Sequence, residues 1–428
     1  MLIFASVFTV IFAILAWKKL DWALILIALG LPSYLLRFKI GPIPMTVLEL
    51  MILIVFAVWL IRFIVSRRGR KATSKASGQG GRVAKLGRGF KWLIMLFLLA
   101  ATIGVIVSPD KIAALGIWKA YFIEPILLFI VLINTFKNKK DFQKLFFAFS
   151  VSAILISLFA IYQKFTGAWI PNAFWQAAET RRVTSIFGYP NAIGLFLAPI
   201  AIWNLGELVL KWQENSWLKR IFFVMTIVLS SLAIVFAQSE GAIAAMAVVS
   251  AIIFFKNKKT RWFLVGAIVL LTGFFVFQPA ERNIVWEKLT LRDFSGQVRM
   301  EMWGETIDML SETPIEGAGL AGYQIRVAPF HIKDYIEIYL YPHNIFLNFW
   351  SEIGLLGLAT WFLIIGKVFW GYWEGGKKKL ETREEYFIIL MIFAVILIHG
   401  LVDVPYFKND LAVFWWILMA RLAALPPM

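Results

Sequence analysis

The sequence contains no cysteine among its 428 residues and only 3 histidines. The lack of cysteine excludes disulfide bonds, thiolate metal ligands and a cysteine nucleophile. The few histidines do not form an HxxxH motif, and the chain has no DxD motif, so the ligand spacings typical of metal sites are missing. We therefore expect neither a metal site nor an organic cofactor.

Charged residues are also scarce, at 16% of the chain, whereas 60% of the residues are hydrophobic. This balance excludes an ordinary soluble globular protein. Apolar runs long enough to cross about 30 Å of hydrocarbon recur along most of the sequence. The sequence predicts an all-α polytopic membrane protein with about twelve or thirteen transmembrane helices near residues 1–17, 21–36, 45–65, 92–107, 118–136, 145–163, 189–210, 221–237, 241–255, 262–277, 343–370, 386–402 and 411–425.

The net charge of +17 does not indicate a nucleic-acid-binding protein, because the basic residues lie in short loops between apolar runs. The loop at 66–91 is rich in lysine and arginine and lacks acidic residues, so we place it in the cytoplasm. If each later segment crosses once, the remaining basic loops share that side. The same alternation places the long polar segment at 278–342 on the outer side.

Three regions follow from this pattern. Residues 1–277 carry the N-terminal transmembrane helices and the basic loop 66–91, residues 278–342 form a long outer loop, and residues 343–428 carry the C-terminal transmembrane helices. Within the outer loop, Ser295–Leu310 has a helical pattern that ends before Pro314. We therefore expect short helices outside the membrane.

Arginines on the outer side are unexpected, because positive charge favours cytoplasmic loops. Arg181 and Arg182 lie in the outer loop that leads to Pro190 and Asn191, where Asn191 is a candidate helix cap. The planar guanidinium group donates paired hydrogen bonds to phosphate and keeps its charge, so these residues indicate an anionic ligand. Arg299 has an alternative interpretation, since it could extend to lipid phosphates or pair with a nearby glutamate.

His343 lies at the start of a predicted helix on the outer surface of the membrane. It is either a structural cap or a general base, because a neutral imidazole can accept a hydroxyl proton. His399 and Asp403 are four residues apart near the outer end of another helix. This spacing predicts that one helix face carries both side chains.

Four blocks resemble motifs of the O-antigen ligase and polymerase superfamily, membrane glycosyltransferases of bacterial cell envelopes. They are RVTSIFGYPN at 182–191, RMEMW at 299–303 followed by PIEGAG at 314–319, HN at 343–344 followed by EIGLLG at 352–357, and HGLVD at 399–403. The resemblance extends from Arg182 to the C-terminus. One departure is Glu240, which stands where many relatives have arginine.

The resemblance implies a fold like that of C-type glycosyltransferases in a bacterial inner membrane, with the active site facing the periplasm. It implies transfer of a glycan from a polyprenyl diphosphate donor, such as undecaprenyl diphosphate, to an acceptor hydroxyl without a metal. The acceptor is lipid A core, another glycan repeat unit or a protein, and membrane lipids surround the helices.

The resemblance also implies roles for individual residues. His343 would act as the base, and Arg299 and Arg182 would neutralise the departing diphosphate. The other residues expected to bind substrate are Arg181, Asn191, Asn344, Trp303, His399 and Asp403.

The main alternative is a transporter or flippase for a lipid-linked glycan. Ionisable residues within apolar helices often mark a transport pathway. Such residues are present at Glu49, Glu124, Glu207 and Glu352. Against this alternative, no inverted repeat is detectable and the distinctive basic residues lie outside the predicted membrane segments.

Overall fold

The computed structural model describes residues 2–41, 43–71, 88–136, 138–333, 335–375 and 380–425. Helices dominate this part of the chain. Its sheet structure consists of one antiparallel hairpin, formed by β1 (Arg37–Ile40) and β2 (Ile43–Thr46). The observed architecture is therefore all-α, as the long apolar runs predict.

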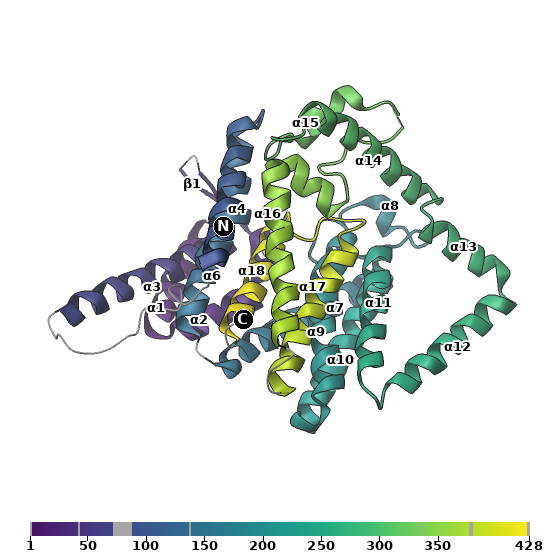
Figure 1. Ribbon diagram of the computed structural model, residues 1–428, viewed down its shortest axis with the longest axis horizontal. Helices are drawn as coiled ribbons and strands as arrows, with labels where there is room; N and C mark the ends of the chain where they lie inside the picture. Colours follow the sequence, from purple (N-terminus) through teal and green to yellow (C-terminus); the bar gives the residue numbers. More distant parts are fainter. Residues whose placement is uncertain are drawn as a thin grey trace.

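The first half of the chain forms helices of which those of residues 2–135 lie on the left in Figure 1, whereas the next two lie beside helices of the second half. They are α1 (Leu2–Lys18), α2 (Leu20–Leu29), η1 (Leu31–Leu35), α3 (Val47–Lys71), α4 (Arg88–Val107), α5 (Lys111–Ile117), η3 (Trp118–Ile123), α6 (Glu124–Thr135), α7 (Lys139–Thr166) and α8 (Ala173–Gln176). The basic segment predicted at 66–91 begins within α3 and ends within α4, and its central residues 72–87 lie outside the described part.

The second half supplies the remaining helices, including those that stand above the bundle in Figure 1. They are α9 (Asn191–Leu210), η4 (Trp212–Glu214), α10 (Trp217–Phe236), α11 (Glu240–Lys256), α12 (Arg261–Phe277), α13 (Pro279–Leu289), α14 (Phe294–Glu312), α15 (Tyr323–Val327), η5 (Ala328–Phe330), α16 (Ile345–Gly375), α17 (Leu380–His399) and α18 (Asn409–Ala424). The helix predicted at 295–310 is confirmed as α14.

Every predicted apolar segment overlaps a helix, but fewer of these helices are long enough to cross a membrane alone. Among the described residues, 7 helices meet the requirements of length and hydropathy, or up to 8 if the bent pair α12 and α13–α14 counts as one span. The difference from the predicted twelve or thirteen arises mainly from length, since α11 and α12 have 17 residues and α18 has 16. The class of polytopic membrane protein is unchanged.

Helix α9 lies at the centre of the bundle, with 89% of its apolar window buried. At 20 residues it spans about 30 Å, since an α-helix rises about 1.5 Å per residue. Asn191 at its start and Glu207 near its end therefore mark opposite ends of the bundle. We call the end with Asn191, which also carries α14 and α15, the upper end, and the other the lower end (Figure 1).

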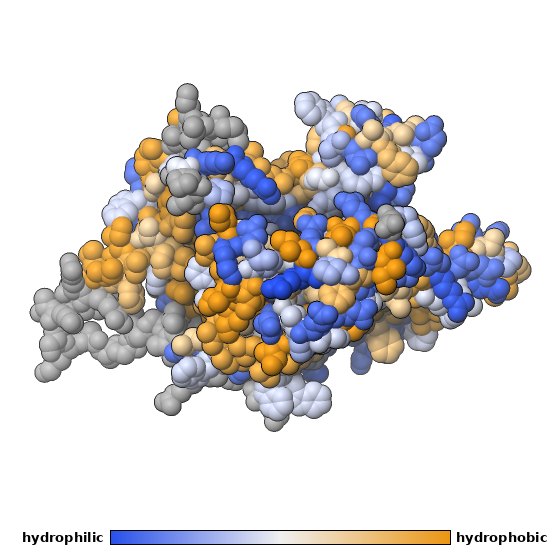
Figure 2. All heavy atoms as spheres, turned by 90° about the horizontal axis from the view of Figure 1, so that it is seen from above, coloured by the Kyte–Doolittle hydropathy of each residue, from blue (hydrophilic) through white to orange (hydrophobic). Residues whose placement is uncertain are grey.

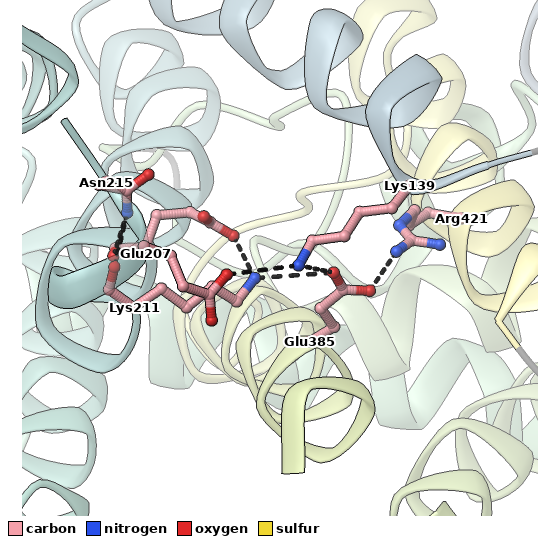
Figure 3. Close-up of polar contacts among 7 residues, drawn as sticks. Lys139, Glu207, Lys211, Asn215, Glu385 and Arg421 are labelled. Carbon is pink, nitrogen blue, oxygen red and sulfur yellow. Dashed lines mark hydrogen bonds and ion pairs between the residues drawn. The ribbon is translucent and has the colours of Figure 1, made fainter. Parts of the chain in front are cut away.

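A buried cluster of charges holds four helices together at the lower end (Figure 3). Lys211 Nζ lies 2.5 Å from Glu207 Oε1, and Lys139 Nζ lies 2.8 Å from Glu385 Oε1. Glu385 also pairs with Arg421 of α18. These contacts join the ends of α7, α9, α17 and α18, because each helix contributes a side chain or the residue that follows it.

Loss of the Glu385 charge should destabilise the bundle. Glu385→Gln leaves Arg421, whose side chain is only 8% exposed, without its carboxylate partner, and an unpaired buried charge costs about 3–5 kcal/mol. Thermal unfolding of the purified protein in detergent measures the effect. Glu214→Gln is the matched control, because the Glu214 side chain is 43% exposed and such pairs contribute about 0–1 kcal/mol. Equal melting temperatures for the two variants would contradict a stabilising role of the cluster.

A kink in α16 provides the docking surface for the upper helices. Ile353 and Gly354 have non-helical backbone angles, which leaves the Ser351 carbonyl free to accept hydrogen bonds from the amides of Ala318 and Gly319. In return, the Leu355 amide donates to the carbonyl of Ile315 at 2.9 Å. The PIEGAG and EIGLLG blocks therefore bind each other through their backbones.

Gly317 is required for this close contact. Its φ is +68°, and a Cβ at this position would lie 2.4 Å from the carbonyl oxygen of Trp350. Gly317→Ala is expected to cost at least about 1–3 kcal/mol, the strain of a left-handed non-glycine residue. Limited proteolysis of the segment between α14 and α16 should accelerate. Gly304→Ala is the control, since a Cβ there meets nothing within 4 Å, and equal cleavage of both variants would contradict the account.

Candidate active site

A cavity of about 570 Å³ opens at the upper end of the bundle. Figure 2 views this end from above and shows hydrophilic residues gathered among hydrophobic ones. The cavity walls come from the start of α9, the start of α11, α14, the segment before α16 and the end of α17. The lining residues predicted from the sequence are Arg182, Asn191, Arg299, His343, His399 and Asp403.

Arg182 and Arg299 enter this cavity bound only to neutral groups. Arg182 donates from Nε to the Ala237 carbonyl at 3.0 Å and from Nη2 to Asn191 Oδ1 at 3.2 Å. Arg299 donates from Nε to the Val402 carbonyl at 3.3 Å. Within the described residues neither guanidinium forms an ion pair, so Arg299 does not pair with a glutamate as the alternative interpretation proposed.

The two arginines influence each other electrostatically. Burial lowers the pKa of Arg182, the positive charge of Arg299 lowers it further, and Glu240 opposes both effects. Two guanidinium groups that repel each other in a partly buried cavity would each be stabilised by an anion between them. An anion that bound between Arg182 and Arg299 would relieve their mutual repulsion.

Glu240 lines the cavity but pairs with Lys288 of α13. A glutamate at the position where many relatives of the resembling family have arginine leaves one cation fewer for a phosphate. The structure supplies a lysine next to it instead, from a helix whose sequence carried no recognisable motif. The positive charge of Lys288 neutralises the negative charge of Glu240 at this edge of the cavity.

His343 is held in an unusual backbone conformation. Its φ is +48°, a left-handed value that a non-glycine residue rarely adopts, and such outliers are concentrated at functional sites. Asn344, and not His343, caps α16, because its Oδ1 accepts from the amides of Phe346 and Leu347. The capping role considered for His343 is therefore wrong.

Asp403 lies next to His343 and connects it to Arg182 through Asn191. Asp403 Oδ1 is 3.5 Å from His343 Nδ1, longer than a standard hydrogen bond, and Oδ2 accepts from Asn191 Nδ2 at 3.3 Å. Since Asn191 Oδ1 accepts from Arg182, a continuous polar chain runs from Arg182 through Asn191 and Asp403 to His343. Asn191 therefore links side chains and does not cap α9 as predicted.

The carboxyl group of Asp403 is strongly acidic. Burial alone would raise its pKa, but His343, His399 and the Val404 amide stabilise the charged form and lower the pKa to about 2. Asp403 is consequently ionised at neutral pH. A buried carboxylate beside an imidazole fixes the orientation of the ring and stabilises its protonated form.

His399 and Asp403 both reach the cavity, but not from one helix face. Helix α17 ends at His399, and Gly400 begins a turn that carries Asp403. His399 instead packs against the start of α11, where a Cβ at Gly241 would lie 2.9 Å from His399 Cδ2. The predicted pairing along a helix is therefore wrong, although the prediction that both lie near the site agrees with the geometry.

Three of the predicted site residues do not line the cavity. Arg181 turns away from its neighbour Arg182 and donates to the carbonyls of Gln176 and Lys164. Trp303 donates from Nε1 to the Pro342 carbonyl at 2.9 Å, which fixes the segment before His343. Asn344 is the helix cap described above. These side chains position the walls of the cavity.

Several tyrosines line the site and were not predicted. The rings of Tyr339 and Tyr341 pack edge-on against His343, with centroids 5.4 Å and 4.8 Å from the imidazole. Tyr189 also lines the cavity, with its side chain in hydrogen-bonding contact with that of Tyr341. Tyr339 and Tyr341 stand just before His343 in the sequence, and this clustering of aromatic residues could have indicated that they contribute to the site.

The described residues contain no group of three or more His, Cys, Asp or Glu placed to hold a metal ion. The cavity offers guanidinium, imidazole, carboxylate and phenol groups. This set can bind an anion and move a proton.

These features define a polytopic α-helical membrane protein with a polar cavity at one end of its bundle. Residues 225–362, from α10 into α16, match the family model Wzy_C, described as O-Antigen ligase. The match includes Arg299 and His343 and confirms the resemblance to the O-antigen ligase and polymerase superfamily. This family implies a membrane enzyme that transfers glycans. A comparison with curated proteins gives no match.

Proposed function

We propose that this protein transfers a glycan from a polyprenyl diphosphate donor, such as undecaprenyl diphosphate, to an acceptor hydroxyl. The observation that carries the proposal is the convergence of Arg182 and Arg299 with His343 and Asp403 in one cavity, where neither arginine has an ion-pair partner in the described part of the chain. The site faces the outer side of a bacterial inner membrane, as the distribution of basic loops predicts.

The arginines act on the leaving group. When the bond between the anomeric carbon and the diphosphate oxygen breaks, negative charge builds on that oxygen. Arg182 and Arg299 stabilise this charge by ion pairing and hydrogen bonds that strengthen as the bond breaks. Their guanidinium groups are already oriented by carbonyl oxygens, so little reorganisation is needed.

His343 acts on the acceptor. With its Nδ1 proton directed at Asp403, its Nε2 has a free lone pair that accepts the proton of the acceptor hydroxyl. The deprotonated oxygen forms the new bond to the anomeric carbon while the diphosphate departs. Asp403 stabilises the resulting imidazolium, and the proton returns to solvent or to the released diphosphate.

No metal is needed in this scheme, because the two arginines supply the positive charge. The polyprenyl tail would lie among the apolar helices, and membrane lipids would surround them. The acceptor is lipid A core, another repeat unit or a protein side chain. These three acceptors correspond to ligation, polymerisation and protein glycosylation.

The transporter alternative receives less support from the ionisable residues that suggested it. Glu49 pairs with Lys119, Glu207 pairs with Lys211, and Glu352 accepts a hydrogen bond from the Ala321 amide. These contacts satisfy three of the four carboxylates at separate positions. The fourth, Glu124, is buried, and its Oε1 has no hydrogen-bond partner among the described residues. A transport pathway would require them to face a common channel.

A transfer assay tests the proposal. Purified protein in liposomes is incubated with a polyprenyl diphosphate glycan and each candidate acceptor in the presence of a chelator. We expect a glycosylated product together with free polyprenyl diphosphate. Movement of the intact donor across the bilayer without bond cleavage would contradict glycan transfer and favour transport. A strict requirement for a divalent metal would contradict the metal-independent scheme.

A further inference from the structure

A second cavity of about 250 Å³ lies at the upper end, beside the β1–β2 hairpin. Its polar and aromatic walls come from the region of η1, β1, α3 and η3, and from the start of α18. The polar side chains among its lining residues include those of Tyr34, Arg37, Glu49, Lys119, Tyr121 and Asn409. None of them belongs to a motif recognised in the sequence.

The two cavities share a wall. The ammonium group of Lys408 lies 5.1 Å from the ring of Tyr34, which lines the second cavity, and 5.7 Å from the ring of Tyr189, which lines the first. Lys408 also pairs with Asp410 at 3.6 Å. The two cavities are therefore neighbours at the upper end, which is the arrangement that a ligand with one part in each cavity would need.

The polar groups of the second cavity are rigidly positioned. Glu49 is buried and accepts hydrogen bonds from the Thr46 amide at 2.8 Å, from Lys119 Nζ at 3.2 Å and from Asn409 Nδ2 at 3.3 Å. These bonds join β2, η3 and α18. A preorganised set of donors and acceptors loses little entropy when a ligand binds.

This composition fits a sugar better than an ion. Sugars present hydroxyls that both donate and accept hydrogen bonds, and apolar ring faces that pack on aromatic side chains. The second cavity offers tyrosine rings next to a carboxylate, an amide and two cations. An inorganic anion would meet Glu49, and Lys119 is already paired with it.

The volume of the second cavity also indicates that it holds only part of a larger ligand. Complete small-molecule sites have roughly 300–1,000 Å³. About 250 Å³ suits one sugar ring of a chain whose reactive end lies in the neighbouring cavity. Arg37, at the exposed rim, is placed to meet hydroxyl or carboxylate groups of that sugar.

We propose that the second cavity binds a sugar unit of the glycan substrate while its diphosphate-linked or acceptor end occupies the first cavity. The proposal rests on the proposed function, since it names a subsite for the same substrate. It assigns a specificity role to Arg37, Glu49 and Asn409. The sugar unit could belong to the donor glycan or to the acceptor glycan, because both present hydroxyls and apolar ring faces. The experiment below distinguishes these two sources.

The test uses free oligosaccharides without diphosphate or lipid, one with the donor repeat and one with the acceptor structure. Binding to the full-length protein is measured by isothermal titration calorimetry. We expect Arg37→Ala to weaken binding of one of them about tenfold, the value of one hydrogen bond to a charged group. Lys39→Ala is the matched control, because Lys39 is exposed on the same strand and does not line the second cavity.

The affected oligosaccharide identifies the source of the sugar. Unchanged binding by Arg37→Ala, or equal losses in Arg37→Ala and Lys39→Ala, would overturn the proposal. A wild-type protein that transfers glycan but binds neither oligosaccharide would overturn the subsite and leave the proposed function intact. A protein that binds sugar through Arg37 but transfers none would overturn the proposed function alone. Melting temperatures of both variants exclude misfolding as the cause of a loss.

Discussion

Replacement of His343 by asparagine is expected to lower the turnover number for glycan transfer by about 10²–10⁴-fold, the usual contribution of a general base. Asparagine tolerates the left-handed backbone conformation that His343 adopts, so the φ of +48° can be kept. The variant therefore removes the proton acceptor with little effect on the chain. The rate of product formation at saturating donor and acceptor measures the loss.

Donor binding should survive this replacement, because His343 is assigned to the acceptor. The dissociation constant of the polyprenyl diphosphate glycan should stay within about threefold of wild type, since the phosphate-binding arginines are untouched. A His343→Asn protein with full turnover would contradict the base assignment. A protein that lost donor binding and turnover together would show that His343 supports the structure of the cavity.

Replacement of Arg182 or Arg299 by alanine should reduce kcat/KM for the donor by about 10²–10³-fold each, comparable to removal of one preorganised donor from a charge-stabilising site. Each variant removes a cation that has no ion-pair partner among the described residues. Transfer rates at limiting donor concentration measure the effect. The loss should appear in both donor affinity and turnover, because the diphosphate is charged before and after bond cleavage.

Arg181→Ala is the matched control for both variants. Arg181 is adjacent to Arg182 in sequence, but its guanidinium donates to the carbonyls of Gln176 and Lys164 and does not line the cavity. Its activity should stay within about threefold of wild type, since it stabilises the loop and no reacting group. A loss as large as that of Arg182→Ala would contradict a specific site and indicate a general effect of positive charge.

The helices could be predicted from the sequence because long apolar runs have few other stable forms in a membrane. Each such run overlaps a helix, and α14 was predicted from periodicity alone. The number of spanning helices could not be predicted in the same way. It depends on exact helix ends and on bends such as the 110° angle between α12 and the following helices.

The site was predicted in part, mainly because the resemblance to a family singled out Arg182, Arg299 and His343. Sequence physics alone could identify unusual arginines on one side but could not show that they meet. Their convergence depends on α14 docking onto the kink of α16 through the backbone contacts of Gly317 and its neighbours. Such long-range backbone contacts leave little trace in hydrophobic periodicity.

The wrong assignments have local physical causes. Arg181 and Arg182 were both expected at the site because the sequence does not show the direction of each side chain, which is set by the irregular loop that carries them. The helical spacing of His399 and Asp403 failed because α17 ends at His399. Lys288 could not be predicted as the partner of Glu240, since the two residues lie on different helices that meet only in the folded chain.

The central claim is that the cavity between Arg182, Arg299 and His343 is where the glycan is transferred. A structure of the protein with a non-cleavable phosphonate analogue of the polyprenyl diphosphate glycan tests this claim most directly. We predict that the diphosphate binds between the guanidinium groups of Arg182 and Arg299, with the anomeric carbon facing His343 Nε2. A diphosphate bound elsewhere, with no ligand between the two guanidinium groups, would contradict it.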